Sequence, residues 1–230
     1  MSTIEPIRRN IQHPAQVKTY SSSLRLWHWL NTLVISGSLI TVLINSTLTD
    51  DHATSSFMKS QFVQAGAKVT DSQAQTVAHA LSDRTWAVHI YFGYALAALL
   101  LFRLLLEFFQ LADQKFIGKL KSAYRQFELT KRNREAAKHE LTVKTIYSVF
   151  YLVLIVMAIT GLFLAFEDAL AAFKSIRHTV KSIHGFCMYI VLAFIAVHLA
   201  GVFLAERKKG KGIVSDMING GNQNEKAPER

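Results

Sequence analysis

The amino-acid sequence predicts an all-α membrane protein, a four-transmembrane-helix bundle with both the N-terminus and the C-terminus in the cytoplasm. Half of the 230 residues are hydrophobic, a larger share than an ordinary soluble domain of this size contains. Four apolar runs of about 20 residues each are long enough to cross a hydrocarbon core of roughly 30 Å. The basic residues also gather in alternate connecting segments, which is typical of membrane proteins.

The first apolar run, residues 26–45, contains no Lys, Arg, Asp or Glu and is predicted to be the first transmembrane helix. It follows a polar arm of more than 20 residues and is not followed by a small-residue cleavage site, so we interpret it as a helix of the bundle and not as a cleaved signal peptide. Trp27 and Trp29 flank His28 at its start and are interpreted as anchors at the membrane interface.

The second run, residues 86–106, contains a single charged residue, Arg103, and is predicted to be the second helix. The segment before it, residues 46–85, is long and rich in Ala, Gln and Ser. Thr54 and Ser55 are predicted to cap a short surface helix in this segment, with Phe57, Phe62, Val63, Val77 and Ala80 among its apolar residues. The alternative interpretation is a solvated connector.

The third and fourth runs, residues 145–166 and 183–205, contain no charged residue and complete the predicted bundle. The basic segment 110–144 between the second and third helices is interpreted as a partly amphipathic helix along the membrane surface or as a solvated connector. We therefore divide the chain into a membrane domain, residues 1–209, and a cytoplasmic C-terminal tail, residues 210–230, which begins with a short amphipathic turn.

The formal net charge of +10 follows from membrane topology and does not indicate a nucleic-acid partner. Lys and Arg crowd the middle segment and both ends of the chain, whereas they are sparse in the other two connections. Positively charged loops stay on the cytoplasmic side, so this distribution places both termini and the middle segment inside. We expect a multi-pass protein of the bacterial inner (cytoplasmic) membrane, with the lipid bilayer as its first partner.

Four of the nine histidines lie within the predicted helices, and their spacing is informative. His184 and His198 are 14 residues apart, so they leave the same face of the fourth helix at positions about 21 Å apart along its axis. The remaining histidines fall outside the helices: His178 is ambiguous, and the others are interpreted as surface residues, namely His13, His52, His79 and His139.

The predicted topology pairs the four helical histidines by depth. His28 begins the first helix at the inner level, where His198 also lies, whereas His89 and His184 both lie at the outer level. Two neutral imidazoles from different helices can be the axial ligands of a low-spin haem, and helical bundles commonly hold such cofactors in their cores. The pattern therefore predicts two haems, stacked across the bilayer and ligated by His28 with His198 and by His89 with His184.

Histidines inside membrane helices have other uses, and two alternatives remain open. The first is a small transporter or proton-relay subunit, although a relay needs acidic partners at depth and the four predicted helices contain no Asp or Glu in their interiors. The second is a haem-containing membrane anchor for a redox complex. Cys187 is the only cysteine, which excludes an intrachain disulfide, a Cys-x-x-Cys-His haem site and clusters ligated by several cysteines.

Four further residues are candidates for contacts with cofactors. Gly93 lies one turn after His89 on the same face, where the missing side chain lets a porphyrin approach. Arg103 shares that face at the inner level and is interpreted either as a partner of a haem propionate or as an arginine that reaches the cytoplasmic interface. Arg25 is a candidate for holding a propionate or an anionic lipid, and Asn31, one turn after His28, is a candidate quinone contact.

The chain resembles the membrane cytochrome b subunit of nickel–iron hydrogenases, in a superfamily that includes the gamma subunit of formate dehydrogenase. The resemblance rests on five stretches: "RLWHWLN" at 25–31, "HIYFGYALAALLLFRLLLEF" at 89–108, "AITGLFLAFE" at 158–167, "HGFCMYIVLAFIAVHLAGVF" at 184–203 and "GIVSDMINGG" at 212–221. They cover all four predicted helices, and the two histidines 14 residues apart are the most specific feature.

The resemblance implies two b haems on the four histidines, a quinone that exchanges electrons near the inner haem, and a redox partner on the outer face. That partner would be a periplasmic-side redox protein or a hydrogenase-like catalytic subunit. The sequence shows no residue pattern for bond-making catalysis, so the chain is predicted to be the electron-transfer subunit of a membrane oxidoreductase complex in a respiratory chain. The direction of electron flow, quinone reduction or quinol oxidation, stays open.

Overall fold

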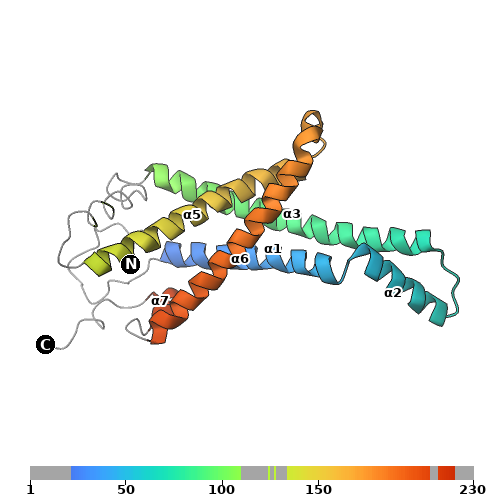
Figure 1. Ribbon diagram of the computed structural model, residues 1–230, viewed down its shortest axis with the longest axis horizontal. Coiled ribbons are helices and arrows are strands. Elements are labelled where there is room, and N and C mark those ends of the chain that lie inside the picture. Colours follow the sequence, from blue (N-terminus) through green and yellow to red (C-terminus); the bar gives the residue numbers. More distant parts are fainter. Residues whose placement is uncertain (1–21, 110–123, 125–126, 128–133, 208–211, 221–230) are drawn as a thin grey trace. The chain divides into compact units, whose positions relative to one another are not determined.

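The computed structural model describes residues 22–109, 124, 127, 134–207 and 212–220, and the described residues form helices without any strand. Four of these helices are long and apolar enough to cross a membrane, which confirms the predicted all-α class with four membrane helices, whereas the cytoplasmic placement of both termini stays a prediction. The chain forms two compact units, residues 30–98 and residues 1–29 with 99–230, and each is described by itself. Figure 1 labels the helices in both units.

In the unit of residues 30–98, helix α1 (Ser22–Thr47) packs antiparallel to helix α3 (Asp71–Phe109). Gly37 allows the close approach, because a Cβ at this position would lie 2.4 Å from the Phe92 ring. Further along the pair, the Ser82 hydroxyl donates to the Asn45 side-chain oxygen over 3.0 Å. The contact of Gly37 with Phe92 and that of Asn45 with Ser82 define the register of this antiparallel pair.

Helix α2 (Asp51–Gln64) lies in the segment between α1 and α3, where a short surface helix was one of the two predictions. Its N-cap is Asp50, whose carboxylate accepts from the Ala53 N–H over 3.0 Å, so the prediction of Thr54 and Ser55 as caps was wrong. Both hydroxyls instead donate to backbone carbonyls, Thr54 to Leu48 and Ser55 to His52. Asp50 is the better cap because its carboxylate also carries a charge that suits the positive end of the helix.

Helix α3 spans 39 residues and begins well before the predicted membrane run. Gly66 ends the preceding turn with a left-handed φ of 80°. Thr70 and Gln73 then form a reciprocal capping box, in which the Gln73 N–H donates to the Thr70 hydroxyl over 3.2 Å and the Thr70 N–H donates to the Gln73 side chain over 2.9 Å. Val77 and Ala80 therefore belong to α3 and not to the same helix as Phe57.

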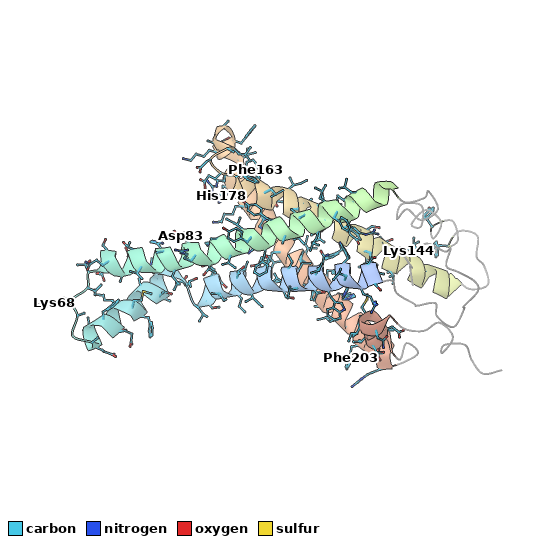
Figure 2. All side chains as sticks on the ribbon, turned by 180° about the vertical axis from the view of Figure 1, so that it is seen from behind. Lys68, Asp83, Lys144, Phe163, His178 and Phe203 are labelled. Atoms are coloured by element: carbon cyan, nitrogen blue, oxygen red, sulfur yellow. The ribbon has the colours of Figure 1, made fainter. Side chains whose placement is uncertain are left out.

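The second unit contains helix α5 (Arg134–Ala165) and helix α6 (Arg177–Arg207), joined through the short 3₁₀ helix η2 (Ala171–Ile176). Phe163 and His178 lie at one end of this α5–α6 hairpin, and Lys144 and Phe203 lie toward the other (Figure 2). The prediction of an amphipathic surface helix over 110–144 falls mostly outside the described residues, but the part from Arg134 onward is the beginning of α5.

Helix α7 (Ile213–Asn219) forms the amphipathic turn predicted after the last membrane helix. Glu206 at the end of α6 accepts hydrogen bonds from the Gly212 N–H over 2.7 Å and from the Val214 N–H over 3.4 Å, which ties the start of α7 to α6. Gly212 and Gly220 border α7 with left-handed φ angles of 90° and 98°, conformations that favour glycine.

Candidate metal centre

His28 in the first turns of α1 and His198 in α6 face each other within one unit. Their ring centroids are 6.5 Å apart and the ring planes are inclined by 52°. The indole ring of Trp29 packs edge-on against His28 with centroids 5.4 Å apart. The two histidines that sequence reasoning paired at the inner level are therefore brought together, and both side chains are half-buried.

The spacing of His28 and His198 would allow both side chains to bind one metal atom. With metal–nitrogen bonds of about 2 Å, and a ring nitrogen roughly 1 Å from each ring centre, two imidazoles that share one metal have centroids about 6 Å apart. No group of three or more His, Cys, Asp or Glu side chains forms among the described residues. A haem needs only two protein ligands, because the porphyrin supplies the other four nitrogens, so this donor set suits a haem better than an isolated metal ion.

An aromatic stack that the sequence analysis missed holds the His198 ring. Phe194, one turn earlier on α6, lies parallel to His198 with centroids 5.9 Å apart and planes inclined by 5°. Phe150 of α5 stacks on Phe194 with centroids 3.8 Å apart. The spacing of four residues between Phe194 and His198 was the signal available in the sequence, since residues four apart on a helix are neighbours.

In the other unit, His89 of α3 is held by polar groups of α1. His89 Nδ1 lies 2.9 Å from the Thr41 hydroxyl, 3.3 Å from the Ser38 hydroxyl and 3.3 Å from the Ser38 carbonyl oxygen. The Trp86 ring packs edge-on against His89 with centroids 5.4 Å apart, as Trp29 does against His28. These contacts fix both the position and the rotation of the imidazole.

His184 of α6 is held in a similar way by α5. Its Nδ1 lies 2.9 Å from the Thr160 hydroxyl. A Cβ at Gly161 would lie only 3.1 Å from His184 Cε1, so the glycine makes room for the ring. His89 and His184 belong to different units, so their pairing at the outer level stays a prediction.

The other predicted contact residues are placed as follows. The Arg103 side chain is 8% exposed within α3, and a buried guanidinium in a membrane helix requires polar partners. Asn31 is also buried, at 7% exposure. Arg25 donates to the Ile218 carbonyl in α7 and to the Ser22 hydroxyl. A Cβ at Gly93 would meet no described atom within 4 Å, so the packing of the described chain does not itself require glycine there.

His52 and His79 agree with their interpretation as surface residues, and His178, which the sequence alone does not classify, is exposed as well. His52, His79 and His178 are exposed, in contrast to the four half-buried histidines of the membrane helices. Cys187 is buried inside α6 at 6% exposure, as expected for a packing residue. His13 and the His139 side chain lie outside the described residues.

The comparisons with known proteins give one positive result. The family described as prokaryotic cytochrome b561 matches residues 19–220, which include all four membrane helices and α7. No curated protein and no solved structure matches the chain. The match covers most of the chain, and together with the four membrane helices it supports haem b as the cofactor and electron transfer as the activity. The chain belongs to the prokaryotic cytochrome b561 family, of membrane electron-transfer proteins that carry haem b.

Proposed function

We propose that this protein carries two b haems and passes electrons between a redox partner on the outer face and the quinone pool. The observation that carries the proposal is the pair His28 and His198, whose rings face each other at 6.5 Å, a spacing that suits one shared iron. The inner haem would be ligated by this pair. The outer haem would be ligated by His89 and His184, on the basis of their matched depth and of the separate polar contacts that orient each ring.

The haems would supply reversible one-electron transfer, and the protein supplies ligands, orientation and exclusion of water. The Phe194 stack holds the His198 ring within the apolar bundle. Arg103, which is buried in α3, is the proposed partner of a propionate of the inner haem. Gly93 is proposed to leave space for the outer macrocycle. The membrane domain would comprise residues 1–209, with both termini and the tail 210–230 in the cytoplasm of a bacterium and the chain in its inner membrane.

We place quinone exchange near the start of α1, where Arg25 and Asn31 lie one turn to either side of His28. Reduction of one quinone consumes two electrons and two protons, and a site at the inner level would take these protons from the cytoplasm. The electrons would come from a periplasmic-side redox protein or a hydrogenase-like catalytic subunit, in keeping with the family. Electron transfer in the opposite direction, from a quinol to the outer partner, would oxidise the quinol.

The test is a haem count on the detergent-purified full chain. We expect a b-type α band in the reduced-minus-oxidised spectrum and two haems per chain by pyridine haemochrome. H28A and H198A should each lower the content to one haem and remove the same spectral component, whereas H178A, which changes an exposed histidine, should keep both haems. Two haems in H28A would exclude the proposed ligation, and absence of haem from the unaltered protein would favour the proton-relay alternative.

A further inference from the structure

Two buried threonines contact two of the membrane histidines in the same way. Thr41 Oγ1 lies 2.9 Å from His89 Nδ1, and Thr160 Oγ1 lies 2.9 Å from His184 Nδ1. The threonine side chains are only 6% and 9% exposed. The first contact joins α1 to α3 and the second joins α5 to α6, so the arrangement occurs separately in each of the two units.

Each threonine hydroxyl also lies close to a carbonyl oxygen of its own helix. Thr41 Oγ1 is 2.6 Å from the Ser38 carbonyl oxygen, and Thr160 Oγ1 is 2.7 Å from the Val156 carbonyl oxygen. Two oxygen atoms at such a distance must share a proton, and a carbonyl has none to give. Each threonine hydroxyl therefore donates its proton to the carbonyl oxygen. Toward the histidine, the threonine oxygen can only accept a hydrogen bond.

The direction of the threonine–histidine hydrogen bonds follows from this proton count. Because both hydroxyls already donate, His89 Nδ1 and His184 Nδ1 must carry the proton and donate it to the threonine oxygen. The Ser38 carbonyl, 3.3 Å from His89 Nδ1, can only accept and supports the same direction. A neutral imidazole with its proton on Nδ1 has its metal-binding lone pair on Nε2.

We infer that Thr41 and Thr160 are positioning residues, which accept the Nδ1 protons of His89 and His184 and so present Nε2 of each ring to the outer haem iron. The inference rests on the proposed ligation of that haem by these two histidines. A hydrogen bond from Nδ1 makes the imidazole a stronger electron donor, which stabilises ferric iron and lowers the reduction potential. The two threonines thus lower the potential of the outer haem, relative to the same haem without these hydrogen bonds.

The experiment compares T41V and T160V with two matched controls. Valine keeps the shape of threonine but cannot accept the Nδ1 proton. Thr47 of α1 and Thr145 of α5 are exposed and donate to the carbonyls of Leu43 and Leu141, so T47V and T145V remove the same helical hydrogen bond away from the histidines. Potentiometric titration and low-temperature EPR of the purified full chain report the potential of each haem and the orientation of its ligands.

We expect T41V and T160V to raise the potential of one haem, to shift its EPR signal, and to weaken its retention by about tenfold or more. T41S and T160S should restore all three properties, because serine keeps the accepting oxygen, and T47V and T145V should match the unaltered protein. Unchanged potentials and EPR signals in both valine variants would overturn the inference. Loss of haem that serine does not restore would also overturn it.

The haem contents of H89A and H184A show whether the threonine role alone is wrong or whether the proposed ligation of the outer haem is wrong. Loss of the same haem in both alanine variants, with no effect of the valine variants, would reject the threonine role alone. Retention of two haems in H89A or in H184A would reject the ligation itself, and the inference with it.

Discussion

The imidazole of His198 lies parallel to the ring of Phe194, with the planes inclined by only 5° and the centroids 5.9 Å apart. Phe194 is in turn stacked on Phe150 of α5, so the two helices meet in an aromatic column that ends at the histidine. Tyr147 packs against the edge of Phe194 with centroids 6.1 Å apart. A ring held on one side by such a column has little freedom to rotate, which suits an axial ligand.

Replacing Phe194 by alanine should affect the orientation of His198, a proposed ligand of the inner haem, more than the proposed ligands of the outer haem. F194A removes the column at its centre, and for this half-buried ring we expect a loss of about 2 kcal/mol of stability. The EPR signal of the inner haem should broaden, because the His198 ring samples more orientations. The control is F186A on the same helix, where the ring is 65% exposed. An F194A protein with an unchanged inner signal would show that the column does not orient His198.

The sequence predicted the four membrane helices well because each depends on a local property, a run of about 20 residues with almost no charge. The closeness of His28 and His198 could also be predicted, because alternating helix directions bring the beginning of the first membrane helix to the same level as the end of the fourth. The N-terminal extension of α3 was missed because residues 71–85 are largely polar and carry no membrane signal. The Thr70–Gln73 capping box was the available indication.

The contacts around the histidines could not be predicted from spacing alone. Thr41 and Thr160 resemble any other threonine that bonds back to its own helix, as Thr47 does, and only the packing of a second helix distinguishes them. The roles of Gly37 and Gly161 depend likewise on Phe92 and His184 of neighbouring helices.

A methyl group at Gly161 should displace the ring of His184, a proposed ligand of the outer haem. In G161A the new Cβ would lie 3.1 Å from His184 Cε1, so the imidazole must shift by a few tenths of an ångström from its position against Thr160. We expect weaker retention of one haem in G161A and a larger loss in G161V, measured by haem content after repeated gel filtration. I159A, which changes a residue 62% exposed on the same helix, is the control. Equal haem content across G161A and G161V would contradict the prediction.

Packing of α1 on α3 should depend on the absence of a side chain at Gly37. A Cβ there would lie 2.4 Å from the Phe92 ring, well inside contact distance, so G37A should destabilise the protein by about 1–3 kcal/mol. The thermal unfolding midpoint in detergent measures the loss. In a double-mutant cycle, F92A should cancel much of the cost of G37A, since it removes the ring that clashes. Additive effects of G37A and F92A would show that a clash with the Phe92 ring is not the cause of the destabilisation.

If His28 and His198 bind the inner haem as proposed, helix α7 should support that haem through the residues that flank His28. Arg25 and Trp29 donate to the carbonyls of Ile218 and Met217, and the Trp29 ring packs edge-on against His28. A chain that ends at residue 211 loses both acceptors, so we expect faster loss of the inner haem on dilution while the outer haem is retained. A chain that ends at residue 220 keeps α7 and is the matched control. W29F, which removes the indole N–H donor and keeps a smaller aromatic ring beside His28, should reproduce part of the effect. Loss of both haems at equal rates in the shorter chain would instead indicate a general loss of stability.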